Sequence, residues 1–165
     1  SLHISSESMV QLCRTFKDLK PASTVQFVNS DDKNDRFVAW IKTAGLVFIK
    51  DKRSEEFGYV SKNMDLARRA SEIMGSETKD DLLEKGELFG YPKLASTAFA
   101  DGHGFSGIIP KNFPHYLASY VRYSVREDFK MEDRLKAKTW SDEIQKDFPA
   151  LDARFEKEME HVEIS

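Results

Sequence analysis

The apolar positions of the chain recur every three or four residues over most of its length, which is the spacing of amphipathic helices. The first stripe consists of Met9, Leu12, Cys13 and Phe16. It predicts a helix over residues 6–20, which Pro21 ends. The second stripe consists of Phe37, Val38, Trp40, Ile41 and Ala44. It predicts a helix that Asp31 or Asp32 caps and Gly45 ends.

Three short segments rich in β-branched and aromatic residues predict strands. They cover residues 24–28, 46–50 and 57–61. The polar segment between the last two has a length of about six residues, which is usual for a connecting loop. We therefore expect the last two strands to pair as a hairpin.

After the third strand the pattern is helical again. Apolar stripes predict helices over residues 63–75 and 78–89, and small residues predict a short helix over residues 94–99. A further helix is expected after Pro114, and two last helices are separated by Pro149. The sequence thus predicts an α+β fold, as a helix-rich single domain over residues 1–165. It would have a small sheet of about three strands and an all-helical C-terminal half.

The composition is that of an ordinary soluble globular protein, with 165 residues of which 40% are hydrophobic and 32% charged. A net charge of −3 argues against a protein that coats DNA or RNA, because such proteins need a basic excess. The acidic excess lies wholly in residues 120–165, with 12 acidic and 9 basic residues. The single cysteine, Cys13, excludes an intramolecular disulfide. With no secretory pattern in residues 1–8, we expect a cytoplasmic location without membrane contact.

Glycine and proline concentrate between Gly86 and Pro114, and this region holds the first candidate site. Five side chains of the window 90–115 could line a ligand pocket, namely Tyr91, Lys93, Asp101, His103 and His115. An exposed imidazole near a carboxylate can transfer protons. The spacing fits no zinc signature and no phosphate-binding loop, so we expect neither a metal nor a cofactor. The structural alternative is an elbow between two helices at Gly90 and Pro92.

Basic side chains gather on the predicted hairpin 46–62 and on the helix after it. They are Lys50, Lys52, Arg53, Arg68 and Arg69. Phe57 and Tyr59 lie among them, and a basic surface with aromatic residues can bind nucleic acid through phosphate contacts and base stacking. Three acidic residues of the same loop dilute the positive charge, which makes nucleic-acid contact the weaker hypothesis.

Residues 86–92, Gly-Glu-Leu-Phe-Gly-Tyr-Pro, resemble a segment of an uncharacterised, mainly archaeal domain family. The resemblance extends over residues 46–99 and includes the first hairpin strand, Gly58-Tyr59-Val60 and Phe99. In that family a Gly-x-Leu-Leu-Gly-Tyr-Pro segment is followed by cysteines. Leu94 and Ala95 stand where the cysteines would fall, so the resemblance implies no thiol or metal role here and no known activity.

The sequence contains no strong catalytic constellation, whereas its predicted helices carry large aromatic residues such as Trp140, Phe148 and Phe155. We therefore expect a non-catalytic binding or interaction domain whose target is a protein partner or a second copy of the chain. One alternative is a small-ligand-binding protein or an enzyme that uses the window 90–115. A second alternative is nucleic-acid contact through the hairpin 46–62.

Overall fold

The computed structural model describes residues 5–27, 33–91, 93–102 and 131–159. The chain divides into two compact units. The first comprises residues 1–76 and 88–90, and the second comprises residues 77–87 and 91–165. This division does not test the expected single domain, which stays a prediction. The caps predicted at Asp31 or Asp32 and the helix predicted after Pro114 lie outside the described residues.

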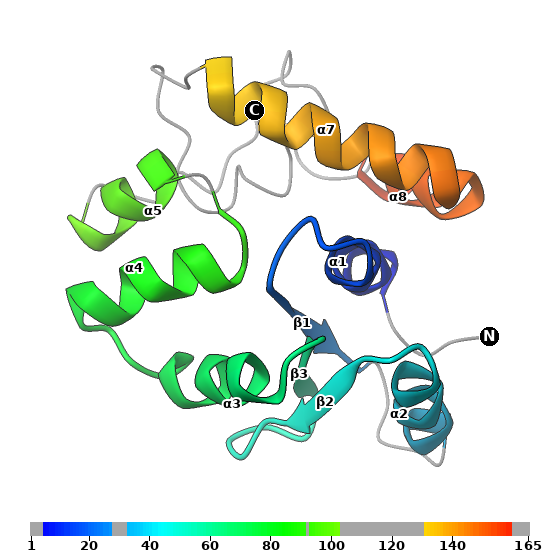
Figure 1. The fold of residues 1–165 in the computed structure, drawn as a ribbon, viewed down its shortest axis with the longest axis horizontal. Helices are drawn as coiled ribbons and strands as arrows, with labels where there is room; N and C mark the ends of the chain where they lie inside the picture. Colours follow the sequence, from blue (N-terminus) through cyan, green and yellow to red (C-terminus); the bar gives the residue numbers. More distant parts are fainter. Residues whose placement is uncertain (1–4, 28–32, 92, 103–130, 160–165) are drawn as a thin grey trace. The chain divides into compact units, whose positions relative to one another are not determined.

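Helices and strands are mixed in the first unit (Figure 1). Its elements are α1 (Ser6–Phe16), β1 (Ala22–Gln26), α2 (Lys33–Thr43), β2 (Val47–Lys50), β3 (Phe57–Ser61) and α3 (Met64–Ile73). The elements that follow are all helical, namely α4 (Lys79–Leu88), α5 (Lys93–Ala100), α7 (Met131–Asp147) and α8 (Pro149–Met159). The predicted α+β fold with a helical C-terminal part is confirmed.

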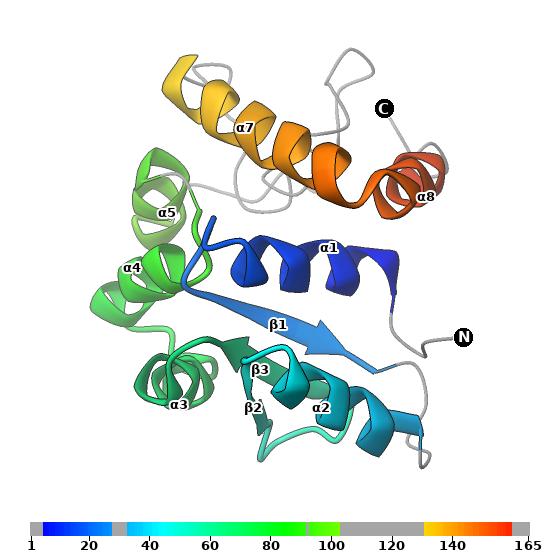
Figure 2. The ribbon, with the colours of Figure 1, turned by 45° about the vertical axis from the view of Figure 1, so that its right-hand side comes forward.

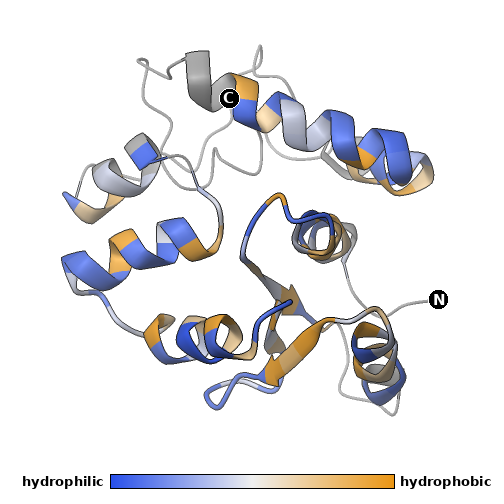
Figure 3. Cartoon of the chain, in the orientation of Figure 1, coloured by the Kyte–Doolittle hydropathy of each residue, from blue (hydrophilic) through white to orange (hydrophobic). Residues whose placement is uncertain are grey.

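Strand β3 lies at the centre of a three-stranded antiparallel sheet with the order β1-β3-β2. Tyr59 of β3 lies opposite Thr24 of β1 and opposite Ile49 of β2. Strands β2 and β3 form the predicted hairpin, and its hydrophilic loop joins two apolar strands (Figure 3). Because both outer strands are antiparallel to β3, they are parallel to each other and need a crossover connection, which α2 provides.

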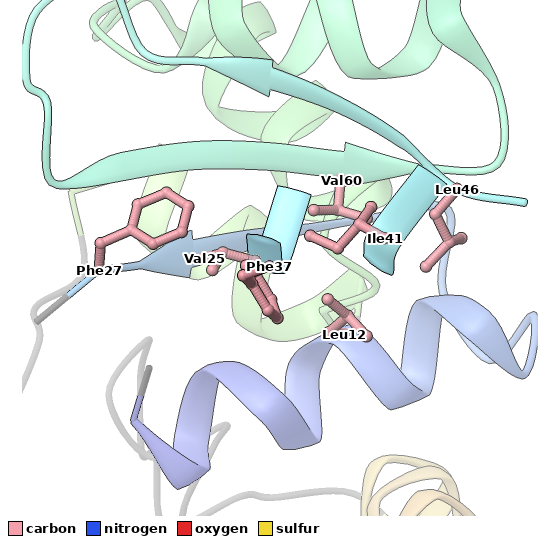
Figure 4. Packing of buried hydrophobic residues seen from close by; sticks show 7 residues of the cluster. All are labelled: Leu12, Val25, Phe27, Phe37, Ile41, Leu46 and Val60. Carbon is pink, nitrogen blue, oxygen red and sulfur yellow. The ribbon is translucent and has the colours of Figure 1, made fainter. Parts of the chain in front are cut away.

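Helices α1 and α2 cover one face of this sheet. Successive side chains of a strand point to opposite faces, and Val25 and Val60 share a face. They cluster with Leu12 of α1 and with Phe37 and Ile41 of α2, and Figure 4 shows these side chains between the strands and α1. Burial of a side chain of this size contributes about 1.5–3 kcal/mol to folding, so this cluster stabilises the first unit.

Helix α3 covers the opposite face, on which Tyr59 lies, so that Figure 1 shows helices on both sides of the sheet. Its buried residues are Ala67, Ala70 and Ile73. Asn63 caps the helix as predicted, because its side chain accepts hydrogen bonds from the N–H groups of Asp65 and Leu66 at 2.8 and 3.2 Å. The two small alanines let α3 approach the strands closely.

Helix α1 runs along β1, and its Ser8 supplies a partner to the strand (Figure 2). The Ser8 Oγ accepts a hydrogen bond from the backbone N–H of Gln26 at 3.1 Å. Two other buried hydroxyl groups in this unit, those of Thr15 and Ser23, have no hydrogen-bond partner among the described residues. A satisfied hydroxyl and unsatisfied ones therefore occur in the same unit.

Alanine at positions 8 and 23 should change stability in different ways. Ser8→Ala removes the acceptor of the Gln26 N–H and should lower the free energy of unfolding by about 1 kcal/mol. Ser23→Ala removes a buried hydroxyl without a partner and should leave the free energy of unfolding unchanged or raise it. Urea unfolding of both variants measures the difference. Equal losses in the two variants would contradict this assignment.

Candidate functional site

The ligand site predicted in the window 90–115 lies only partly within the described residues. Tyr91 is half-buried just after α4, and Lys93 is exposed at the start of α5. His103 and His115 lie outside the described residues. The structure therefore does not test whether these side chains share a pocket, and the site stays a prediction.

Asp101, the last described member of that predicted site, forms an ion pair within the second unit. Its carboxylate lies 2.6 Å from the ammonium group of Lys79 in the first turn of α4. The hydrogen bond to Asp101 and its negative charge raise the pKa of Lys79. The pair joins the start of α4 to the residue that follows α5.

Gly90 supports the elbow interpretation of the Gly-Tyr-Pro segment. It follows α4 with a φ of +72°, in the left-handed region that residues with a Cβ rarely adopt. The N–H of Tyr91 donates to the carbonyl oxygen of Gly86 at 2.8 Å, which is the longer hydrogen bond of a Schellman helix end. The requirement for glycine at position 90 is thus a requirement for ending α4.

Gly86 is required for a different reason, because α4 and α5 approach each other closely at this position. A Cβ at Gly86 would overlap the Oγ of Ser96 and would lie 2.5 Å from the Ser96 Cβ. Both approaches are far closer than van der Waals contact. The two glycines of the segment 86–92 therefore have packing and backbone reasons that need no ligand.

Most of the predicted nucleic-acid-binding side chains on the hairpin and α3 interact with nearby carboxylates. Lys50 and Arg69 lie 3.8 and 3.7 Å from glutamate oxygens. Lys52 and Arg68 are exposed and form no ion pair with a residue that the structure describes. Local carboxylates weaken the attraction of a phosphate backbone, and nucleic-acid contact stays a prediction.

Arg53, the fifth of those residues, holds the hairpin loop against α3. Its Nε lies 3.3 Å from Asp51 Oδ1, and its Nη2 donates to the carbonyl oxygen of Ser71 at 3.4 Å. Asp51 Oδ2 also accepts a 2.5 Å hydrogen bond from the Tyr59 hydroxyl. These contacts across the sequence give Arg53 a structural role that the sequence pattern did not indicate.

The same contacts shift two pKa values in opposite directions. Burial first, and then the hydrogen bond to Asp51, raise the pKa of Tyr59 to about 12. Burial would raise the pKa of Asp51, but the hydrogen bonds from Tyr59 and Arg53 outweigh it and lower that pKa. The folded protein therefore favours a charged Asp51 beside a neutral Tyr59.

Cys13 is a buried residue of α1, as its place on the apolar stripe predicts. Burial raises the pKa of its thiol to about 11, although the nearby positive charge of Lys17 opposes the shift. The thiol is protonated at neutral pH, and a protonated, buried thiol is a poor nucleophile.

The aromatic residues on which the interaction hypothesis was based are largely covered. Trp140 and Phe155 are buried, and Phe148 is half-buried. Trp140 lies on α7 and Phe155 on α8, and these two helices contact each other within the second unit. These side chains are therefore explained by packing and offer little surface to a partner.

Trp40 is exposed although the sequence pattern places it on the apolar stripe of its helix. Its side chain remains 46% exposed, whereas Phe37 and Ile41 of the same helix are buried in the core. The Trp40 ring stacks on that of Phe37, with a centroid distance of 6.0 Å and an interplanar angle of 27°. Trp40 thus lies at the border of the apolar stripe. One face of its ring contacts Phe37, and the rest of the side chain is open to solvent.

We define the α2 surface as the exposed side chains of residues 35–43, which are Asp35, Arg36, Ala39, Trp40, Lys42 and Thr43. Arg36 lies one helical turn before Trp40, and Thr43 lies about one turn after it. Its three charged residues form no ion pair with any residue that the structure describes. The α2 surface combines an exposed tryptophan with charges that have no partner among the described residues, and it is the candidate functional site.

The chain matches no protein-family model, no curated protein and no solved structure. The resemblance over residues 46–99 therefore stays a prediction. In the described part of the chain, no helix combines the length and apolar character needed to cross a membrane. The same residues contain no group of three or more histidine, cysteine, aspartate or glutamate side chains placed to hold a metal ion.

Tyr59→Phe should change how stability depends on alkaline pH. The raised pKa of Tyr59 means that its contribution is complete below pH 10 and is lost as the pH rises from 10 to about 12. The variant lacks this ionisation, so its free energy of unfolding should fall less steeply over that range. Unfolding in urea at several pH values measures both slopes. Parallel slopes for the variant and the parent protein would contradict the assignment.

Asp51 should affect how the free energy of unfolding depends on acidic pH. Its lowered pKa means that its contribution is present above its ordinary pKa of 3.8 and is lost as the pH falls through the lower, folded-state pKa. Asp51→Asn should therefore reduce stability at neutral pH and flatten the acid limb of the stability curve. Urea unfolding between pH 2 and pH 7 tests this. An acid limb as steep as that of the parent would refute it.

Gly86→Ala should destabilise the contact between α4 and α5. Overpacking costs roughly 1–3 kcal/mol, and alanine recovers roughly 1 kcal/mol of helix propensity, so we expect a net loss of about 1 kcal/mol. Adding Ser96→Gly removes both atoms that the new methyl group would meet and should recover part of the loss. A double-mutant cycle with Ser96→Gly alone as the control measures this coupling. Strictly additive effects would show that the two positions do not touch.

Proposed function

We propose that this protein is a non-catalytic binding protein that recognises a protein partner through the α2 surface. The observation that carries the proposal is the 46% exposure of Trp40. Tryptophan and arginine are the residue types that most often dominate the binding energy of protein interfaces. The α2 surface presents one of each, one helical turn apart, on a regular helix.

The stacking of Trp40 on Phe37 supports this role. Phe37 is buried in the core cluster, so the Trp40 ring rests on a rigid base. A side chain that is already held in place loses little conformational freedom when a partner covers it. Trp40 therefore has the properties of a preformed anchor.

The charges of the α2 surface support the same role. Arg36 and Lys42 are both exposed and form no ion pair within the described part of the chain. A partner with complementary charges could engage them, which would add specificity to the contact that Trp40 makes. By contrast, Asp101 and Arg53 of the other two candidate sites have charged partners within their own unit.

A photo-reactive side chain on the α2 surface tests the proposal. Replacement of Thr43 by p-benzoylphenylalanine places the probe about one turn from Trp40 on the exposed side of the helix. Irradiation of cells that express the full chain should give an adduct of defined mass. Trp40→Ala should abolish this adduct, because it removes the anchor.

The matched control carries the same probe at Arg68, an exposed position on α3, and should give no such adduct. The loss of the ring stack with Phe37 should reduce the stability of Trp40→Ala by about 1 kcal/mol. Circular dichroism therefore has to show that this variant is folded. An adduct that persists in the folded Trp40→Ala variant would refute the proposal, as would the absence of any adduct at position 43.

A further inference from the structure

The charges of the α2 surface have a symmetry that restricts its partner. Asp35 lies in the first turn of α2 and Lys42 in the last turn, on the same side of the helix and two turns apart. Both are exposed, and neither forms an ion pair with a residue that the structure describes. One helix thus presents an acid and a base at opposite ends of a single line.

Ala39 lies midway between these two charges and is exposed. Two helices can approach to about 8 Å where the residues at their crossing point are small. A methyl group at the centre of the α2 surface therefore permits a close crossing by another helix, with longer side chains on either side of the contact.

Resting on the proposed function, we infer that the partner of the α2 surface is a second copy of this chain, with the two α2 helices packed antiparallel about a two-fold axis near Ala39. The axis places Asp35 of each copy beside Lys42 of the other, because the two residues lie almost equally far from Ala39. A parallel two-fold pair would instead place Asp35 and Lys42 beside the opposite side of the partner helix, where Arg36, Trp40 and Thr43 lie. It would leave Lys42 without a carboxylate beside it and would keep the two Trp40 rings apart. The charge pattern therefore favours the antiparallel arrangement.

The same axis brings the apolar residues together. In a two-fold antiparallel pair, residues on one side of the first helix meet residues on the same side of the second. Asp35 and Lys42 share one side, whereas Arg36, Trp40 and Thr43 share the other. The two Trp40 rings would meet near the axis, each beside an Arg36 guanidinium that can stack on it. The part of each Trp40 side chain that is exposed in the single chain would then be buried in the dimer.

Charge reversal tests the arrangement. Asp35→Lys brings two ammonium groups together at each end of the helix pair, and Lys42→Asp brings two carboxylates together there. Each variant alone should therefore dissociate, with the dimer Kd raised roughly tenfold or more. An equimolar mixture restores both oppositely charged pairs and should recover the dimer. Sedimentation velocity of the full chain at several concentrations measures all three samples and the parent protein.

Arg68→Asp, a charge reversal at an exposed position of α3, is the matched control and should sediment as the parent does. A parent protein that remains monomeric at high micromolar concentration would overturn the inference, as would a mixture that stays as dissociated as its components. In either case the photo-crosslinking experiment at position 43 still tests the proposed function independently of self-association. An adduct with a different protein that Trp40→Ala abolishes would retain that function without self-association.

Discussion

The first unit depends on the burial of its central strand on both faces. Tyr59 and Val60 are adjacent in β3, point to opposite faces and are each at most 1% exposed. A three-stranded sheet can bury both faces only if helices cover both, which α3 does on one side and α1 with α2 on the other. The single layer formed by α1 and α2 leaves the outer side of α2 in solvent. The exposure of the candidate site follows from this layering.

Polar contacts add specific links between the elements of the first unit, beside the non-directional burial of apolar side chains. Arg53 links the β2–β3 loop to α3, because it binds Asp51 within the loop and the Ser71 carbonyl near the end of α3. In the same way, Ser8 links α1 to the end of β1 through the hydrogen bond from the Gln26 N–H. Arg53 and Ser8 are polar residues without a distinctive sequence pattern, and in the structure they form hydrogen bonds between elements.

Sequence patterns predicted the elements well where local chemistry decides them. The hairpin strands, the Asn63 cap and the break at Pro149 were confirmed. Strand β1 begins at Ala22, earlier than predicted, because pairing with β3 includes residues without β-branching. Helix α1 ends at Phe16, and Asp18 has a φ of 60°, where the stripe had predicted four more residues. The exposure of Trp40 was missed because it depends on which side of α2 packs against the sheet. The role of Arg53 was missed because it depends on Tyr59 and on the Ser71 carbonyl of α3.

The positions of the two tryptophans have a spectroscopic consequence. Trp40 belongs to the first unit and is 46% exposed, whereas Trp140 belongs to the second unit and is 3% exposed. The chain contains no other tryptophan. The native fluorescence is therefore the sum of one solvated and one shielded indole, and a soluble quencher separates them. Each compact unit carries its own optical reporter, so the order in which the units unfold can be read without adding a label.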